Sequence, residues 1–216
     1  LAVSIGKFIQ TRHEMNGDIS AERAIEIFRE HGGILRTREA LHLGIHPRVL
    51  YALRDSGALE QLSRGLYRLA ELPPLTNPDL VTIALKVPGA VICLISALAF
   101  HELTTQVPHA VDIALNKGDE PPRLDYPPLH LFWFSGPAYS EGIDTHVIDG
   151  TPVRIYSPEK TIADCFKLRR RVGLDVALEA LKAYRQRPGF DPARLLHYAR
   201  ICRVESVIKP YLEALL

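Results

Sequence analysis

The sequence predicts an α+β protein in which a winged helix-turn-helix precedes a mixed α+β domain. Residues 20–72 have the chain order helix, short strand, helix, helix, hairpin, which is the order of a winged helix-turn-helix. Beyond residue 80, strand-like segments come first and helix-like segments last, which favours α+β over alternating α/β. The segment ELPPLTNPDL, residues 71–80, has three prolines and marks the boundary between the two parts.

The first helix is expected to begin after Ser20, a good N-cap, and to end at the glycine pair 32–33. Its apolar stripe consists of Ala24, Ile25, Ile27, Phe28 and His31. Residues 34–35 can form a very short strand. Thr37 can then cap a second short helix, which ends at Gly44.

A third helix is expected to begin at Pro47, because the missing N–H of proline would be unpaired at that position anyway. This helix ends at Gly57. The stripe that packs on the first helix is formed by Val49, Leu50 and Leu53. Segments 59–63 and 66–70 read as two strands joined around Arg64-Gly65, where the glycine supplies the positive φ of a tight hairpin.

The second part of the chain has five strand-like and five helix-like segments. Strands are expected at 90–95, 111–116, 129–134, 145–148 and 152–156. Helices are expected at 96–104, 157–169, 174–186, 191–201 and 204–216. The predicted organisation is therefore a lead-in segment (1–19), a winged helix-turn-helix domain (20–72), a linker (73–80) and an α+β domain (81–216).

Composition indicates a soluble globular protein. The chain is 47% hydrophobic and 24% charged, which allows a real core, and its formal charge is only +1. The three cysteines (Cys93, Cys165 and Cys202) are far apart, so we expect buried free thiols and neither a metal nor another cofactor. The most apolar stretch, 88–103, is shorter than the ~20 residues that span a bilayer. With no secretory signal evident at the N-terminus, we expect a cytoplasmic protein without membrane contact.

The third helix carries the main candidate site. Its apolar stripe leaves Arg48, Tyr51 and Arg54 on the other side, at spacings of three residues. Arginines one turn apart suit a helix in the DNA major groove, where a guanidinium can bridge O6 and N7 of guanine. The N-terminal residues His46 and Arg48 would then go deepest into the groove.

Further cations surround this helix. Arg64 lies at the hairpin tip and Arg68 on its second strand, positions suited to phosphates or a minor groove. Arg36 and Arg38 flank the start of the second helix, where backbone N–H groups also favour a phosphate. Residues 32–68 contain six arginines against three acidic residues, a local balance of +3. The alternative to DNA binding is that this part of the chain is a solvated helical domain that mediates protein contacts.

Several motifs resemble a known family. The segment GGILRTREALHLGIHPRVLYALRDSGALEQLSRGLYRL (32–69) is similar to the winged-helix domain of AbiEi-type antitoxins, regulators of viral defence systems. Two later runs, Ser96 to His101 (S-A-L-x-x-H) and Pro158 to Asp164 (P-x-K-T-x-x-D), resemble the second domain of that family. The resemblance covers about residues 20 to 200.

The resemblance implies the antitoxin of a bacterial type IV toxin–antitoxin system. It implies repression of the protein's own operon through inverted repeats in double-stranded DNA, with oligomerisation on DNA as one way to gain affinity. It also implies a nucleotidyltransferase-like toxin that is opposed without a stable complex. The DNA-contacting role carries over to residues of the matching segment, namely Arg36, Arg38, Arg48, Tyr51, Arg54, Arg64 and Arg68.

An enzyme is the alternative for the second domain. A metal-dependent nuclease or nucleotidyltransferase needs two or three carboxylates around magnesium, and Glu102, Asp112 and Asp164 are the candidates. No paired-carboxylate spacing, phosphate loop or nucleophile motif accompanies them. We therefore expect no catalytic residues, with His101 as a hydrogen-bonded helix residue and Asp164 paired with Lys160 or Lys167.

The run KLRRR, residues 167–171, suggests a second basic patch. It would include Lys160, Lys167, Arg169, Arg170 and Arg171. Cations at a helix C-terminus also complement the helix dipole, which is the structural alternative. A functional patch would touch DNA or an RNA-like partner. Trp133 and Phe134 lie in a strand and are expected in the core.

Overall fold

The computed structural model describes residues 19–215 and divides the chain into two compact units, Leu1–Pro74 and Leu75–Leu216. The lead-in segment expected over residues 1–19 lies outside the described residues except for Ile19. Helices and strands are mixed in both units, which confirms the α+β class.

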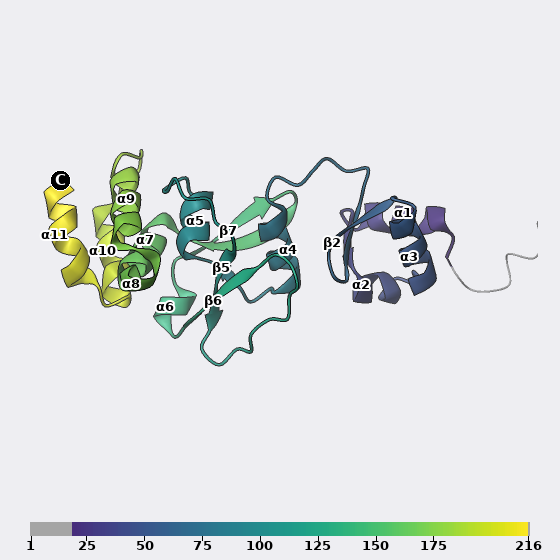
Figure 1. Ribbon diagram of the computed structural model, residues 1–216, viewed down its shortest axis with the longest axis horizontal. Helices are drawn as coiled ribbons and strands as arrows, with labels where there is room; N and C mark the ends of the chain where they lie inside the picture. Colours follow the sequence, from purple (N-terminus) through teal and green to yellow (C-terminus); the bar gives the residue numbers. More distant parts are fainter. Residues whose placement is uncertain (1–18, 216) are drawn as a thin grey trace, which may run out of the picture. The chain divides into compact units, whose positions relative to one another are not determined.

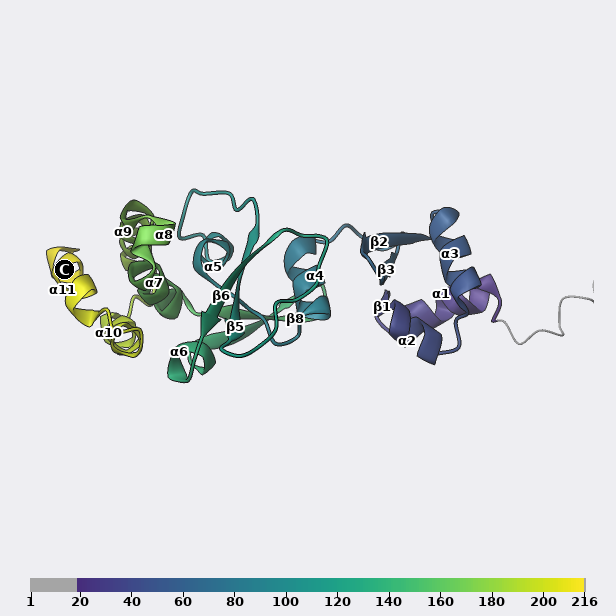
Figure 2. The same ribbon diagram turned by 60° about the horizontal axis from the view of Figure 1, so that its bottom comes forward.

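The described part of the first unit, residues 19–74, contains three helices and a small antiparallel sheet (Figure 2). Its elements are α1 (Ala21–Glu30), β1 (Ile34–Arg36), α2 (Thr37–His42), α3 (Pro47–Asp55), β2 (Leu59–Ser63) and β3 (Leu66–Leu69). Strand β3 lies in the middle and pairs with β1 on one side and β2 on the other. These elements follow the predicted order.

Local chemistry fixes the helix ends of this unit. The Ser20 side chain accepts a hydrogen bond from the Arg23 N–H at 3.2 Å and caps α1, as predicted. Thr37, in contrast, is the first residue of α2 and not its cap, because Arg36 takes the N-cap position. Leu50 and Leu53 of α3 are buried in one core with Phe28 of α1, so the predicted apolar stripe is confirmed.

The second unit contains a five-stranded sheet and eight helices among the described residues. Its strands are β4 (Val91–Ile92), β5 (Val111–Asn116), β6 (Leu129–Phe134), β7 (Ile143–Ile148) and β8 (Thr151–Tyr156), in the order β6-β5-β4-β8-β7. Its helices are α4 (Pro78–Lys86), α5 (Leu94–Phe100), α6 (Pro137–Ser140), α7 (Pro158–Lys167), α8 (Arg169–Val172), α9 (Leu174–Arg185), α10 (Pro192–Ile201) and α11 (Glu205–Leu215).

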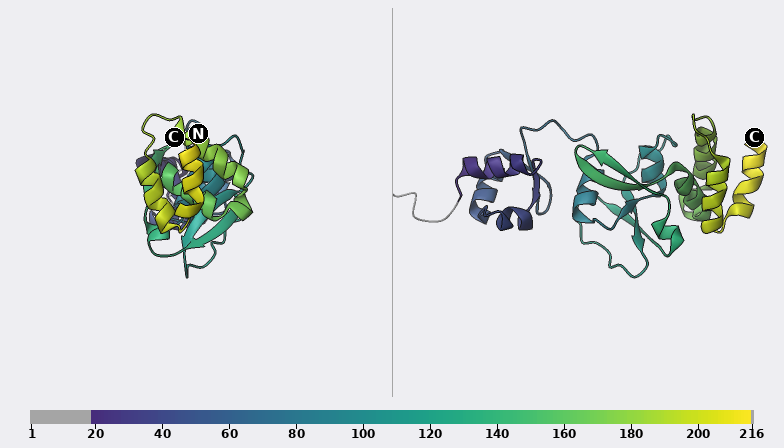
Figure 3. Two further views of the ribbon diagram at one scale, coloured as in Figure 1. Left: turned by 90° about the vertical axis from the view of Figure 1, so that its left-hand side faces the viewer. Right: turned by 180° about the vertical axis from the view of Figure 1, so that it is seen from behind.

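Helices cover both faces of this sheet. Helix α4 lies on one side of the strands, and α5 and the C-terminal helices lie on the other (Figure 1). Successive side chains of β5 point to opposite faces of the sheet, so the strand packs against helices on both sides. Ala114 faces the core of the C-terminal helices, while Ile113 and Leu115 point to the opposite face. Figure 3 shows the C-terminal helices, in green and yellow, grouped at one end of the unit.

Three helices differ from the sequence expectation. Helix α4 begins at Pro78, inside the segment expected as a linker. Proline is well tolerated in the first helical turn, so its presence there did not exclude a helix. Short helices α6 and α8 were not expected either. Because α4 and α5 precede β5, the expected order of strands first and helices last is met only in part.

Two side-chain predictions in the second unit have different outcomes. The three cysteines are buried free thiols, as expected, and burial raises the pKa of Cys202 to about 12. Phe134 is in the core as predicted. Trp133 is not, because it points away from the helical core and remains 45% exposed.

Among the described residues, no helix is long and apolar enough to cross a membrane.

Candidate nucleic-acid interface

The exposed face of α3 carries several of the predicted DNA-contacting residues. His46 caps the helix by accepting a hydrogen bond from the Arg48 N–H at 3.2 Å through Nδ1. His46 and Arg48 are exposed, and the Tyr51 side chain is 43% exposed. The helix thus presents cations and an aromatic ring to solvent beside its buried face.

A hollow of about 310 Å³ lies between α3 and the β2–β3 hairpin. It brings together three predicted residues, Tyr51, Arg54 and Arg64. Arg54 ion-pairs with Asp55 at 2.7 Å and its guanidinium lies 5.1 Å from the centre of the Tyr51 ring. Arg54 Nε donates a hydrogen bond to Asp55 Oδ1, which raises the pKa of Arg54 and orients its side chain.

The hollow also contains residues that the sequence pattern did not mark as DNA-contacting. Thr37, Gln61 and Tyr67 line it together with Gly65. Gln61 and Tyr67 are cross-strand partners, and the register shifts between Gln61 and Ser63. Because of this irregularity, the side chains of β2 do not simply alternate between the two faces of the sheet. The sequence pattern therefore did not indicate that Gln61 would face the hollow.

The start of α2 is less open to an anion than predicted. The Thr37 N–H donates to the Gly65 carbonyl at 2.9 Å, and the Arg36 N–H donates to Glu39 at 2.8 Å. The Arg36 side chain is half-buried and lies 3.8 Å from Glu39. Arg38 is exposed and remains the better candidate for a phosphate contact.

Arg68 is not placed to contact DNA, which corrects the sequence prediction. Its side chain is 4% exposed and ion-pairs with Glu60 at 2.6 Å. A second guanidinium nitrogen donates to the Pro73 carbonyl. Because β3 is the central strand, Arg68 lies within the sheet and ties the hairpin to the segment that follows it.

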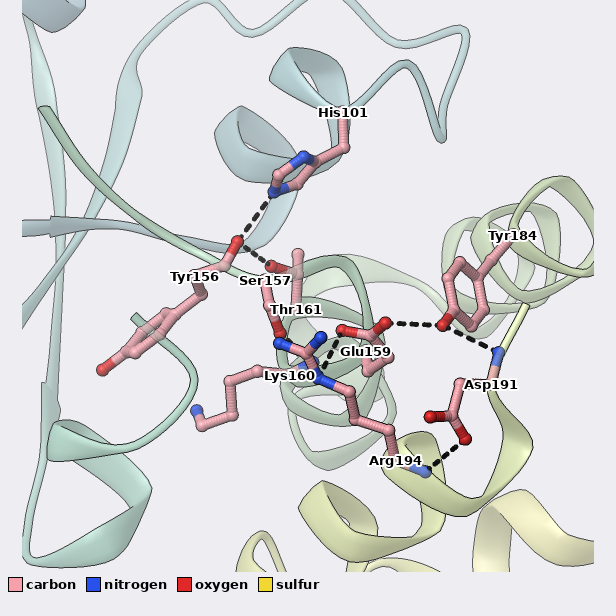
Figure 4. Close-up of polar contacts among 9 residues, drawn as sticks. All are labelled: His101, Tyr156, Ser157, Glu159, Lys160, Thr161, Tyr184, Asp191 and Arg194. Atoms are coloured by element: carbon pink, nitrogen blue, oxygen red, sulfur yellow. Dashed lines mark hydrogen bonds and ion pairs between the residues drawn. The ribbon is translucent and has the colours of Figure 1, made fainter. Parts of the chain in front are cut away.

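Lys160 does not belong to a surface patch, which corrects the second prediction. Its ammonium group is fully buried and lies 2.5 Å from Asp164 Oδ2, the pairing expected for Asp164. The ammonium also lies 4.1 Å from the centre of the Tyr156 ring (Figure 4). Asp164 accepts a further hydrogen bond from the Cys202 thiol at 3.1 Å. Lys160 is therefore part of the core.

A polar network surrounds the start of α7 (Figure 4). The Tyr156 carbonyl accepts hydrogen bonds from His101 Nε2 at 2.8 Å and from the Thr161 hydroxyl at 3.2 Å. Glu159 accepts a hydrogen bond from Tyr184 at 2.6 Å and lies 3.5 Å from Arg194. The two distinctive sequence runs, 96–101 and 158–164, thus meet at one carbonyl group. Their side chains organise the fold, as expected for His101.

The cations of the KLRRR run, residues 167–171, have different surroundings. The Arg171 guanidinium lies 4.2 Å from the centre of the Phe132 ring, while Arg170 is exposed. Arg169 donates to the Phe166 carbonyl at 2.9 Å, as a cation at a helix C-terminus would. Lys167 and Arg169 face the same hollow in the second unit.

The three candidate carboxylates are engaged in separate places. Asp112 accepts hydrogen bonds from the Ile95 N–H and His130 Nδ1, each at 3.0 Å, and burial raises its pKa. Asp164 pairs with Lys160, and Glu102 is exposed. Within residues 19–215, no group of three His, Cys, Asp or Glu side chains could hold a metal ion. The three carboxylates therefore do not converge on one site.

The buried imidazole of His101 makes stability depend on pH. Burial lowers its pKa, with further lowering by His146 and Arg187, against a raising effect of the Tyr156 carbonyl. Because the folded-state pKa lies below the unfolded value of about 6.5, the unfolded chain binds more protons in mild acid. The stabilisation by neutral His101 is thus present above about pH 6.5 and is lost as the pH falls towards the folded-state pKa.

We expect the thermal unfolding midpoint to fall when the pH is lowered from about 7.5 to about 5.5. The variant His101→Gln keeps an N–H donor for the Tyr156 carbonyl but cannot take up the proton, so its midpoint should fall less. An equal fall in both proteins would assign the acid sensitivity to other groups.

From Ile19 onward, the first unit consists of three helices and a three-stranded sheet, with arginines on the exposed face of α3. A family model described as transcriptional regulator, AbiEi antitoxin, matches residues 22–70, which confirms the resemblance over most of this unit. No curated protein matches the sequence.

Among solved structures, the RV2827C protein from Mycobacterium tuberculosis is similar in fold. Its TM-score is 0.54 at 14% sequence identity, over 92% of this chain and 83% of that chain. An antigenic nucleotidyltransferase-like protein from Paracoccidioides brasiliensis matches 66% of this chain and 95% of that chain at 14% identity. The TM-score of this second match is 0.33, which is too low to support a shared fold.

Proposed function

We propose that the chain is a sequence-specific DNA-binding transcriptional autoregulator. In this proposal the first unit is a winged helix-turn-helix, α3 is its recognition helix and the β2–β3 hairpin is its wing. The observation that carries the proposal is the exposed face of α3, where Arg48 and Tyr51 lie next to a hollow lined by Arg54 and Arg64. The match of residues 22–70 to antitoxin regulators supports it.

The two groups of residues have different roles in this proposal. His46 and Arg48 are at the N-terminal end of α3 and enter the major groove, where Arg48 reads a guanine. Arg54 and Arg64 border the hollow between helix and hairpin, where the sugar–phosphate backbone passes. Arg38 adds a contact from α2. The orientation of Arg54 by Asp55 suits a fixed phosphate contact better than base readout.

The antitoxin role is the second part of the proposal. The match of residues 22–70 to AbiEi antitoxin regulators supports an antitoxin role. We further propose that the chain is the cytoplasmic antitoxin of a type IV (AbiE-like) system, and that its second unit opposes a nucleotidyltransferase-like toxin without a stable complex. The operator would be inverted repeats upstream of the protein's own coding region. Since the net charge is only +1, several copies on one operator would supply affinity that a single unit lacks.

A gel-shift titration tests the DNA-binding proposal. The full chain is titrated on DNA from upstream of its own coding region and on a scrambled duplex of equal length, at about 150 mM salt, where purely electrostatic binding is weakened. We expect stepwise retardation of the upstream DNA alone. Retardation of neither duplex would favour a module that mediates protein contacts. Equal retardation of both would show that DNA binding is not sequence-specific and would contradict the proposal.

A further inference from the structure

A second hollow, of about 690 Å³, lies in the second unit where three helices end or begin. Lys167 is the last residue of α7, Arg169 begins α8, and Arg203 follows α10. Ser135, which follows β6, adds a hydroxyl group. The volume lies within the range of about 300–1,000 Å³ that small-molecule sites occupy.

The three cations of this hollow lack acidic partners. Within residues 19–215, no carboxylate lies within ion-pair distance of Lys167, Arg169 or Arg203. Arg169 makes one hydrogen bond to the Phe166 carbonyl, and the Lys167 ammonium lies 5.7 Å from the centre of the Phe134 ring. Three positive charges thus converge on one concave surface without local neutralisation. Such a surface favours a multiply charged anion.

The backbone conformation at Arg203 shows that the fold does not require an arginine at this position. Arg203 has φ +60, a conformation that glycine adopts far more readily. It occupies the first position beyond the C-cap of α10, where its N–H donates to the Arg200 carbonyl and the Val204 N–H donates to the Ala199 carbonyl. This pattern is the Schellman motif, which usually has glycine at that position. The chain carries a long cation where glycine would be more stable, and this cation lines the hollow.

The other wall of the hollow is apolar. It is formed by Pro137, Ala138, Ile201 and Val204. A duplex backbone is hydrophilic and convex and is usually contacted by protruding cations. A concave site with an apolar wall beside three cations fits a small ligand that has both a polyphosphate and a flat, weakly polar ring.

We propose that this hollow binds a nucleoside triphosphate. Its phosphate groups lie against Lys167, Arg169 and Arg203, which offer the charge-assisted hydrogen bonds that arginine forms well with phosphate. Its base lies against the apolar wall. The hollow is lined by residues of the second unit alone, and the proposal does not depend on DNA binding by the first unit.

Isothermal titration calorimetry of the full chain tests the proposal, with ATP and GTP as probes and inorganic phosphate as a competitor. We expect saturable binding with one site per chain, and about tenfold or greater weakening in Arg203→Gly and in Arg169→Gln. The matched control is Arg170→Gln, which removes the same charge from an adjacent exposed residue outside the hollow. Its affinity should equal that of the unaltered protein.

Thermal unfolding separates a lost site from a damaged fold. Because glycine suits the backbone at position 203, Arg203→Gly should melt at the same temperature as the unaltered protein or higher while binding nucleotide more weakly. Arg169→Gln provides a second, independent loss of binding. No binding of either nucleotide by the unaltered protein, or equal weakening by Arg170→Gln, would overturn the proposal.

A DNA-binding experiment tests whether the hollow binds the phosphate groups of a nucleotide or those of a DNA backbone. In the same gel-shift titration, Arg203→Gly should leave the affinity for duplex DNA and its salt dependence unchanged. If this variant instead weakens DNA binding and leaves nucleotide binding intact, the hollow contacts a nucleic-acid backbone and the nucleotide proposal is wrong.

Discussion

Replacement of Asp164 by alanine is expected to lower the free energy of unfolding by about 3–5 kcal/mol, because it leaves a buried ammonium group without its counter-ion. Lys160 and Asp164 are both fully buried, one helical turn apart on α7, at 2.5 Å. The faces of the Tyr156 and Phe134 rings, 4.1 and 5.1 Å away, interact with the ammonium but cannot neutralise it. The measurement is urea-induced unfolding followed by circular dichroism.

A double variant distinguishes a missing partner from a pair that stabilises the protein. Lys160→Met combined with Asp164→Leu removes both charges at similar volume, and we expect it to be far less destabilised than Asp164→Ala. The exposed pair Lys209 and Glu213 has the same spacing at 3.9 Å, so Glu213→Ala should cost less than about 0.5 kcal/mol. A loss below about 1 kcal/mol in Asp164→Ala would mean that Lys160 finds water or another acceptor after a small shift.

The Lys160 and Asp164 pair also shows what the sequence could not reveal. The run 157–169 predicts a helix correctly, and its i,i+4 spacing allows the pair. An i,i+4 lysine–aspartate pair is ordinarily a feature of an exposed helix face. Helix α7 is instead packed against α5, α9 and α10, so three of its charged residues, Glu159, Lys160 and Asp164, lie inside. Only the tertiary arrangement determines this burial.

Arg68 is a second residue, here on a strand, whose burial could not be predicted from the local sequence. By sequence, Arg64 and Arg68 are two arginines on one hairpin, and both suit a wing that touches DNA. The hairpin itself could be predicted from its residues. The addition of β1 to the outer side of β3, which places Arg68 in the middle of a sheet, depends on pairing between segments about thirty residues apart. No local pattern indicates that pairing.

The elements that could be predicted best have strong local patterns. Strands β5 and β6 occur at the predicted residues, because each is a compact apolar run bounded by turn residues. Helix α3 follows from Pro47 and its apolar stripe. Helix α4 was not predicted because three prolines and an asparagine precede its apolar residues, and that composition indicated a linker. The hollow of the second unit could not be foreseen, since its cations come from segments far apart in the chain.

Replacement of Arg48 by alanine is expected to relax the DNA sequence preference and to weaken operator binding by about 1–3 kcal/mol, roughly 5- to 150-fold. Arg48 is exposed near the start of α3, and its side chain has no carboxylate partner among residues 19–215. Its guanidinium is therefore available for a bidentate contact with guanine. This result depends on the proposed function.

The comparison with Arg38→Ala separates base readout from backbone contact. Arg38 is exposed on α2 and does not belong to the proposed recognition helix, so its loss should weaken binding to operator and scrambled DNA equally and reduce the salt dependence. Arg200→Ala, on the second unit, removes an equal charge from an ion pair with Glu205 and should change neither. The measurement is a fluorescence anisotropy titration of all three variants on both duplexes at two salt concentrations. If Arg48→Ala lowers both affinities by the same factor, Arg48 contacts phosphate and the bases are read by other residues of α3.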